Sequence, residues 1–117
     1  MVTPLQVLKT ARKLIAKKEG WTKGTCARNR SGVPVDWDES SAVSFCAYGA
    51  IYRAAIPLDS AGDRVHLKAE DFLKKVIQRP TIQFWNDEWE RTKKEVLAAF
   101  DQAIANASKK TTKGSRR

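Results

Sequence analysis

Three side chains in this sequence are of the types that catalyse reactions through a nucleophile: Cys46, His66 and Asp87. A cysteine near a helix start is a nucleophile when the helix dipole stabilises its thiolate, with a histidine as base and an Asp or Asn, here Asp87 or Asn86, orienting that base. Cys46 lies in a wholly apolar stretch, however, and a buried cysteine is usually an inert small hydrophobic residue. We therefore expect no catalytic residues, and a small enzyme that depends on Cys46 is the alternative.

Asn86 and Asp87 have a second interpretation, because they form a polar turn directly after Trp85. Asx side chains accept hydrogen bonds from nearby backbone amides and stabilise corners. A structural corner is the favoured prediction. The alternative is a polar pocket that these residues form with Tyr48, Trp85 and Arg91.

Residues that could bind a metal ion are scarce in the chain. Two cysteines and one histidine provide no Cys/His spacing typical of a metal site. Asp36, Asp38 and Glu39 alternate like ligands of a hard cation, but the glycine and later glutamate of a calcium-binding loop are missing. Capping of a following helix is the favoured role of these acids. We predict no metal, no cofactor and two reduced thiols.

The net charge of +9 is concentrated at the two ends of the chain. Residues 1–30 hold eight basic side chains and one acid, and residues 108–117 hold five basic side chains and no acid. This distribution suits contact with a polyanion or an acidic protein surface, although a solvated basic face with a flexible tail has the same composition. The candidate contacts are Lys9, Arg12, Lys13, Lys17, Lys23, Arg28, Arg30, Lys109, Lys110, Arg116 and Arg117.

Two tryptophans in the loop that follows the first predicted helix could add base contacts to these charges. Trp21 or Trp37 can stack on an unpaired base if its ring is exposed. No helix-turn-helix, zinc-finger or ribonucleoprotein signature accompanies the basic residues. The signal for nucleic-acid binding is therefore generic.

Helices are predicted over residues 3–18, 42–56, 64–78 and 92–107. Thr3 with Gln6, and Thr92 with Glu95, have the spacing of capping boxes, and apolar residues recur at helical spacing after each. Residues 42–52 carry no charge, so the second helix is expected to be buried on all sides at the centre of the domain. Residues 20–41 are predicted to form a long structured loop, with a short extended piece at 33–35. Residues 81–85 fit either a strand or a coil.

These elements predict a mainly α fold with four helices around the buried central helix, and they leave room for a small β element. Residues 1–107 form a single helical domain and residues 108–117 a flexible basic tail. No apolar run reaches the roughly 18 residues of a membrane span, and no secretory signal precedes the first helix. We therefore expect a cytoplasmic protein that does not enter membranes.

Three short blocks together resemble an uncharacterised family of small bacterial and phage proteins. The blocks are F-C-x-x-G-A-I at 45–51, W-N-D at 85–87 and R-T-x-x-E-V-L at 91–97. The resemblance implies a small, mainly helical domain and no assigned activity. It also predicts that the turn at Asn86 and Asp87 packs beside the buried helix that begins near Cys46.

The charge pattern and the resemblance predict a small non-enzymatic binding or accessory protein of the phage or mobile-element type. It would contact nucleic acid or an acidic protein partner through the first helix, the loop and the tail. A further alternative is an inhibitor of a nucleic-acid-binding protein, which would use basic patches without reading bases. Nothing in the sequence indicates the oligomeric state.

Overall fold

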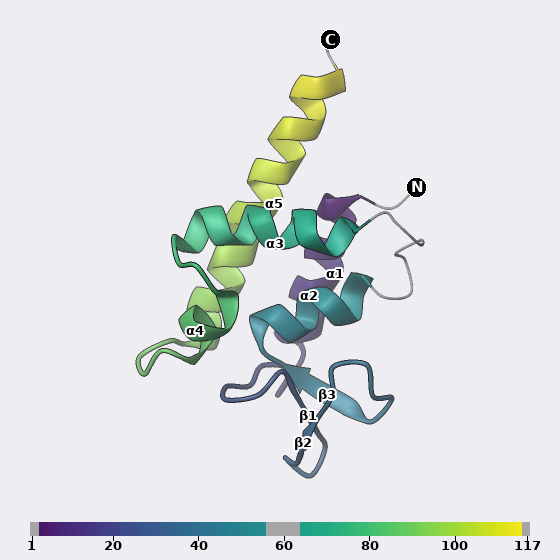
Figure 1. Ribbon diagram of the computed structural model, residues 1–117, viewed down its shortest axis with the longest axis vertical. Coiled ribbons are helices and arrows are strands. Elements are labelled where there is room, and N and C mark those ends of the chain that lie inside the picture. Colours follow the sequence, from purple (N-terminus) through teal and green to yellow (C-terminus); the bar gives the residue numbers. More distant parts are fainter. Residues whose placement is uncertain (1–2, 56–63, 116–117) are drawn as a thin grey trace.

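The computed structural model describes residues 3–55 and 64–115, with side chains up to residue 109. The described part is mainly helical and has a small antiparallel sheet (Figure 1). Its elements are α1 (Pro4–Ala16), β1 (Ala27–Asn29), β2 (Pro34–Val35), β3 (Ala42–Phe45), α2 (Ala47–Ala55), α3 (Val65–Ile77), α4 (Ile82–Asp87) and α5 (Lys93–Ser115).

Helix α1 begins at the predicted capping box. The backbone N–H of Gln6 donates to Thr3 Oγ1 at 3.2 Å, and the N–H of Thr3 donates to Gln6 Oε1 at 3.0 Å. The chain turns away after Ala16 and passes Gly20, where a Cβ atom would lie 2.2 Å from the carbonyl oxygen of Leu14. Only glycine allows the chain to fold back so closely against the end of α1.

Residues 42–45 form strand β3, so the prediction that the second helix begins at residue 42 is wrong. β3 pairs antiparallel with β1, which also pairs with β2, in the order β2-β1-β3. Burial alternates over the first three residues, with Ala42 and Ser44 buried and Val43 exposed. Short apolar runs suit a strand or a buried helix equally well, and pairing with β1 decides between them here.

Helix α2 therefore starts at Ala47, with Cys46 as the residue that caps it. The N–H of Gly49 donates to Cys46 Sγ at 3.2 Å. Most of α2 is buried, as predicted, but Tyr48 and Tyr52 reach the protein surface in part. The expectation that this helix is buried on every face is wrong for that side.

The described residues contain five helices rather than the predicted four, because residues 82–87 form α4. Thr81 caps α4 by accepting a hydrogen bond from Phe84 N at 3.3 Å. A second capping box precedes α5, as predicted: Glu95 N donates to Thr92 Oγ1 at 3.2 Å and Thr92 N to Glu95 Oε1 at 3.0 Å. The bond from the Thr92 amide is the main reason why the pKa of Glu95 is lowered.

Helix α5 continues to Ser115, past the end predicted near Ala107. Its C-terminal half extends beyond the other helices in Figure 1. The last buried residue of α5 whose side chain the structure describes is Ala107. The flexibility predicted for residues 108–117 stays a prediction.

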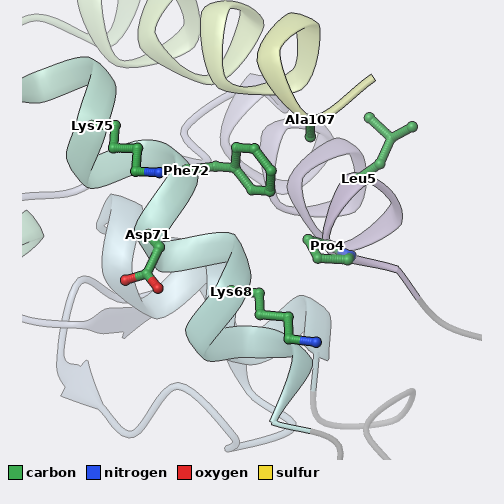
Figure 2. Close-up of a pocket in the computed structure, with 7 residues that line it drawn as sticks. All are labelled: Pro4, Leu5, Lys68, Asp71, Phe72, Lys75 and Ala107. Atoms are coloured by element: carbon green, nitrogen blue, oxygen red, sulfur yellow. The ribbon is translucent and has the colours of Figure 1, made fainter. Parts of the chain in front are cut away.

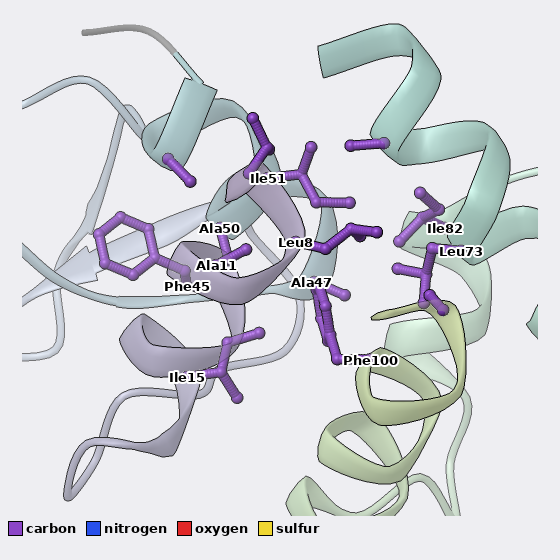
Figure 3. Packing of buried hydrophobic residues seen from close by; sticks show 14 of the residues in the cluster. Leu8, Ala11, Ile15, Phe45, Ala47, Ala50, Ile51, Leu73, Ile82 and Phe100 are labelled. Carbon is purple, nitrogen blue, oxygen red and sulfur yellow. The ribbon is translucent and has the colours of Figure 1, made fainter. Parts of the chain in front are cut away.

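A single core joins all five helices and strand β3 (Figure 3). Helix α1 packs against α2, α3, α5 and β3, so it shares the central position that the sequence assigned to the second helix alone. The core side chains labelled in Figure 3 are Leu8, Ala11, Ile15, Phe45, Ala47, Ala50, Ile51, Leu73, Ile82 and Phe100. Among the described helices, none combines the length and the apolar character needed to cross a membrane.

Candidate nucleic-acid interface

Asn86 is completely buried and uses its whole side-chain amide to join three segments. Its Oδ1 accepts from Trp21 Nε1 at 2.7 Å and from Ala47 N at 3.0 Å. Its Nδ2 donates to Thr22 O at 3.0 Å and to Asp87 Oδ1 at 2.9 Å. Asn86 and Asp87 end helix α4 instead of forming the predicted turn. Asn86 nevertheless packs beside the start of α2, as the resemblance predicted, and caps that helix from a distance of 39 residues in sequence.

Asp87 and Lys23 tie the loop after α1 to the same corner. Asp87 Oδ1 accepts a hydrogen bond from Gly24 N at 3.0 Å. Lys23 Nζ donates to the carbonyl oxygens of Glu88 at 2.7 Å and Trp89 at 3.2 Å. Lys23 was a candidate for nucleic-acid binding, and these contacts give it a structural role.

Arg91 holds the corner from the other side. Its guanidinium lies 4.3 Å from the centre of the Trp85 ring, and its Nε donates to the Trp85 carbonyl oxygen at 3.0 Å. Ion pairs to Glu88 at 2.5 Å and Glu95 at 3.4 Å complete its contacts. The polar groups of Asn86 and Arg91 thus bond to neighbouring residues of the chain rather than facing open space. This favours the structural corner over a ligand pocket.

Trp89 lies at the protein surface, where 93% of the residue is exposed. Phe84, on α4, is 75% exposed. Trp85, by contrast, packs into the core.

Tyr48 belongs to an aromatic cluster on the outer side of α2. The Tyr48 and Tyr52 ring centres are 4.4 Å apart, and Tyr52 lies 5.4 Å from Trp37 and 4.9 Å from His66. The Tyr52 hydroxyl donates to Glu70 Oε2 at 2.9 Å. Burial, then the neighbouring Tyr48 and Glu70, raise the pKa of Tyr52 far above its ordinary value. Trp37 is thus half-buried in a packing role.

The chemistry of Cys46 does not favour a nucleophile. The thiol lies at a helix start, as expected, but burial raises its pKa to about 12, so it is protonated at neutral pH. Burial also raises the pKa of Cys26, the neighbour whose carbonyl oxygen accepts from Cys46 N at 3.0 Å. His66 packs on Tyr52, whereas Asp87 binds the loop after α1. These contacts do not assemble a base and its orienting group around the thiol.

Two more predicted basic contacts have partners within the protein. Arg12 forms an ion pair with Asp101 of α5, with 2.5 Å between Nε and Oδ1. Arg28 donates to Thr22 Oγ1 at 2.8 Å and to the carbonyl oxygens of Gly32 and Lys23, each at 3.0 Å. Arg28 therefore fixes the shape of the loop and hairpin.

Two lysines of α1 and the lysine that directly follows the helix remain exposed. Lys9 and Lys13 are four residues apart on one face of α1, and Lys17 extends this stripe at the C-terminal cap, where the chain leaves the helix. In residues 3–55 and 64–109, whose side chains the structure describes, no hydrogen-bond or ion-pair partner meets their ammonium groups. Lys109 is also exposed, on α5. The side chain of Lys110 and both Arg116 and Arg117 lie outside the described residues.

A polar hollow of about 420 Å³ opens beside the end of this lysine stripe. Its lining joins the turn after α1 to the sheet: Lys18, Glu19, Trp21, Asn29, Arg30, Gly32, Val43 and Ser44. Of the predicted contacts, Arg30 and the base-stacking candidate Trp21 lie here. Lys18, Asn29 and Ser44 were not predicted, because they come together only when the β1–β2 hairpin folds back toward α1.

A second hollow of about 420 Å³ lies at the other end of α1 (Figure 2). Phe72 of α3 points between α1 and α5, with Lys68, Asp71 and Lys75 along the same helix. The remaining lining residues are Pro4, Leu5 and Ala107. This hollow is more apolar than the hollow beside Trp21. Its two lysines, Lys68 and Lys75, lie on the same helix as the carboxylate of Asp71.

The fold and these surfaces define a small, mainly helical protein with one basic face and a buried polar corner that fixes its loops. The chain belongs to a family of unknown function, described as Family of unknown function (DUF6197), whose model matches residues 1–106. Searches of curated proteins and of solved structures find no match to the chain.

Proposed function

We propose that this protein is a non-enzymatic accessory protein that binds nucleic acid through the exposed face of α1. One observation carries the proposal: Lys9, Lys13 and Lys17 form an exposed stripe that has no partner among the described side chains and leads to Lys18 and Arg30 beside the polar hollow. The cytoplasm, and a phage or mobile element, are the setting we propose. The phage or mobile-element origin is supported by the sequence resemblance alone.

The stripe suits a phosphate backbone in both charge and length. From Lys9 to Ala16, the last residue of α1, the helix rises about 10 Å at 1.5 Å per residue, and Lys17 follows directly. Duplex DNA carries one negative charge per about 1.7 Å of axis, so several phosphates lie within that length. Neutralising them releases counterions, which is the source of affinity that does not depend on sequence.

A cysteine-dependent enzyme receives less support. Catalysis by Cys46 would need a thiolate near neutral pH, and burial raises the pKa of this thiol to about 12. The thiol also accepts the hydrogen bond that caps α2. An acidic protein partner would use the same lysines, and it becomes the partner to test if no nucleic acid binds.

The test is fluorescence anisotropy of labelled 20-nucleotide DNA and RNA, single-stranded and duplex, over a range of salt concentrations. We expect binding at low salt that weakens steeply with added salt. The triple variant Lys9→Gln, Lys13→Gln, Lys17→Gln should reduce the salt slope on duplex DNA by about 3, because each lost phosphate contact removes about 0.9.

The matched control removes three lysines from α3 instead: Lys68→Gln, Lys74→Gln, Lys75→Gln. It changes the net charge equally and should leave most of the affinity. Equal losses in the two triple variants would mean that only the total charge matters. Absence of binding at low salt would refute the proposal and leave an acidic protein as the partner to test.

A further inference from the structure

The hollow beside Trp21 contains more than charge, because several hydrogen-bond donors on its lining residues have no partner in the described part of the chain. They are the ammonium of Lys18, the guanidinium of Arg30, Asn29 Nδ2 and the hydroxyl of Ser44. A hollow of 300 to 1,000 Å³ with a few convergent polar groups is typical of a small-ligand site, and this one measures about 420 Å³.

We propose that this hollow receives one unpaired nucleotide of the bound nucleic acid. The inference rests on the proposed function and adds to it a preference for single strands. Lys18 and Arg30 supply the positive charge for a phosphate, and Trp21 supplies an aromatic surface for a base. Asn29 and Ser44 donate hydrogen bonds to base or sugar oxygens, and the Glu19 carboxylate accepts from amino or hydroxyl groups.

The walls of the hollow are fixed before any ligand arrives. Trp21 is held by its hydrogen bond to Asn86 at 2.7 Å and by a backbone bridge to Phe45. Asn29 Oδ1 accepts from Ser31 N at 2.9 Å and Val33 N at 3.0 Å, which orients its free Nδ2 group. Binding therefore needs little ordering of Trp21 and Asn29, which lowers its entropic cost, whereas Lys18 and Arg30 are ordered by the ligand.

A neighbouring hollow of about 390 Å³ continues the surface. It shares Asn29, Arg30 and Val43 with the first hollow and adds Ser31, Ser40 and Ser41. Arg30 therefore lies between two polar depressions. A single strand can place adjacent nucleotides on either side of it, whereas a duplex holds its bases stacked inside and presents only its outer surface.

The experiment compares the affinities for a single strand of 20 thymidines and for a 20-base-pair duplex at one salt concentration. The unmodified protein should bind the single strand about tenfold more tightly, in line with the usual gain from stacking a base. Lys18→Gln with Arg30→Gln should bring that ratio close to one. Both side chains are exposed, so the fold should be retained, and circular dichroism checks this.

The control Lys9→Gln with Lys13→Gln removes the same charge from the stripe. It should weaken both ligands equally and leave the ratio unchanged. Ser44→Ala, which removes one donor without changing the charge, should lower the ratio in part. If the unmodified protein and the variants of the hollow have the same ratio of single-strand to duplex affinity, this inference is refuted while the proposed function stands. If neither ligand binds, the proposed function itself fails.

Discussion

Asn86 shows how one polar side chain organises a corner of this protein. An amide side chain has two donor hydrogens and an oxygen that accepts two bonds, and Asn86 uses all of them on Trp21, Ala47, Thr22 and Asp87. Its partners come from the loop after α1, the start of α2 and the end of α4. Its loss would leave the buried N–H of Ala47 and the half-buried Nε1–H of Trp21 without an acceptor.

Asn86→Ala should therefore lower the free energy of unfolding by about 3 kcal/mol, because each buried group left unpaired costs about 1 to 3 kcal/mol. Urea denaturation followed by tryptophan fluorescence measures the change. Trp89→Ala is the control: the side chain is 93% exposed, and its removal should change stability by less than about 0.5 kcal/mol. Equal losses for the two variants would contradict the role of Asn86.

Some residue roles follow from local sequence and others do not. The capping boxes at Thr3 and Thr92 were predicted because both members of each box lie within one helical turn. The partners of Asn86 lie 39 and 65 residues away in sequence, so no local spacing could identify them. The same is true of Arg28, whose guanidinium was expected to bind nucleic acid and instead holds the loop.

At the scale of elements, Gly49 controls how closely α2 approaches the sheet. A Cβ atom at Gly49 would lie 2.3 Å from the carbonyl oxygen of Cys26, the residue directly before β1. That distance is far inside van der Waals contact with a backbone atom. A larger residue must therefore move the helix away from the strand.

Gly49→Ala should destabilise the protein by about 3 kcal/mol or more, at the upper end of overpacking effects. Thermal unfolding followed by circular dichroism measures the change. Gly32→Ala provides the comparison: its φ of +85° disfavours alanine by about 1 kcal/mol, but nothing lies within 4 Å of the added Cβ. A smaller loss at Gly49 than at Gly32 would show that α2 and β1 are not in close contact.

The two element types that were predicted wrongly have a shared cause. Residues 42–45 and 82–87 are segments of fewer than two helical turns, for which periodicity does not separate helix from strand. Tertiary contacts decided both: β3 pairs with β1, and α4 buries Ile82 and Trp85 against the core. The longer amphipathic helices α1, α3 and α5 were predicted correctly in type, since their apolar stripes extend over several turns.

At the scale of the whole molecule, the basic residues divide into two groups. Arg12, Lys23 and Arg28 are bound to other parts of the chain, whereas Lys9, Lys13 and Lys17 face outward. The net charge of the chain therefore overstates how many basic side chains are available to bind a polyanion.

The boundary of the folded domain can be tested by truncation. Ala107 is the last buried side chain described on α5, so a chain that ends at residue 107 should keep its free energy of unfolding within about 1 kcal/mol. Urea denaturation of the 117-residue chain and of the chain that ends at residue 107 measures this difference. A chain that ends at Phe100 loses the buried Ala103 and Ala107 and should be clearly less stable. Equal stability of the two truncated chains would contradict this boundary.

The sequence by itself determined the mainly helical class, the helix starts at the capping boxes, the family and the concentration of charge in the first thirty residues. These properties depend on composition and on patterns within a few turns of chain, where local physics acts. Only the tertiary structure decided that 42–45 is a strand, that Asn86 is a buried link between three segments and that Lys18, Asn29, Arg30 and Ser44 line one hollow. These features need contacts between residues far apart in sequence, which become favourable only when the core has brought the segments together.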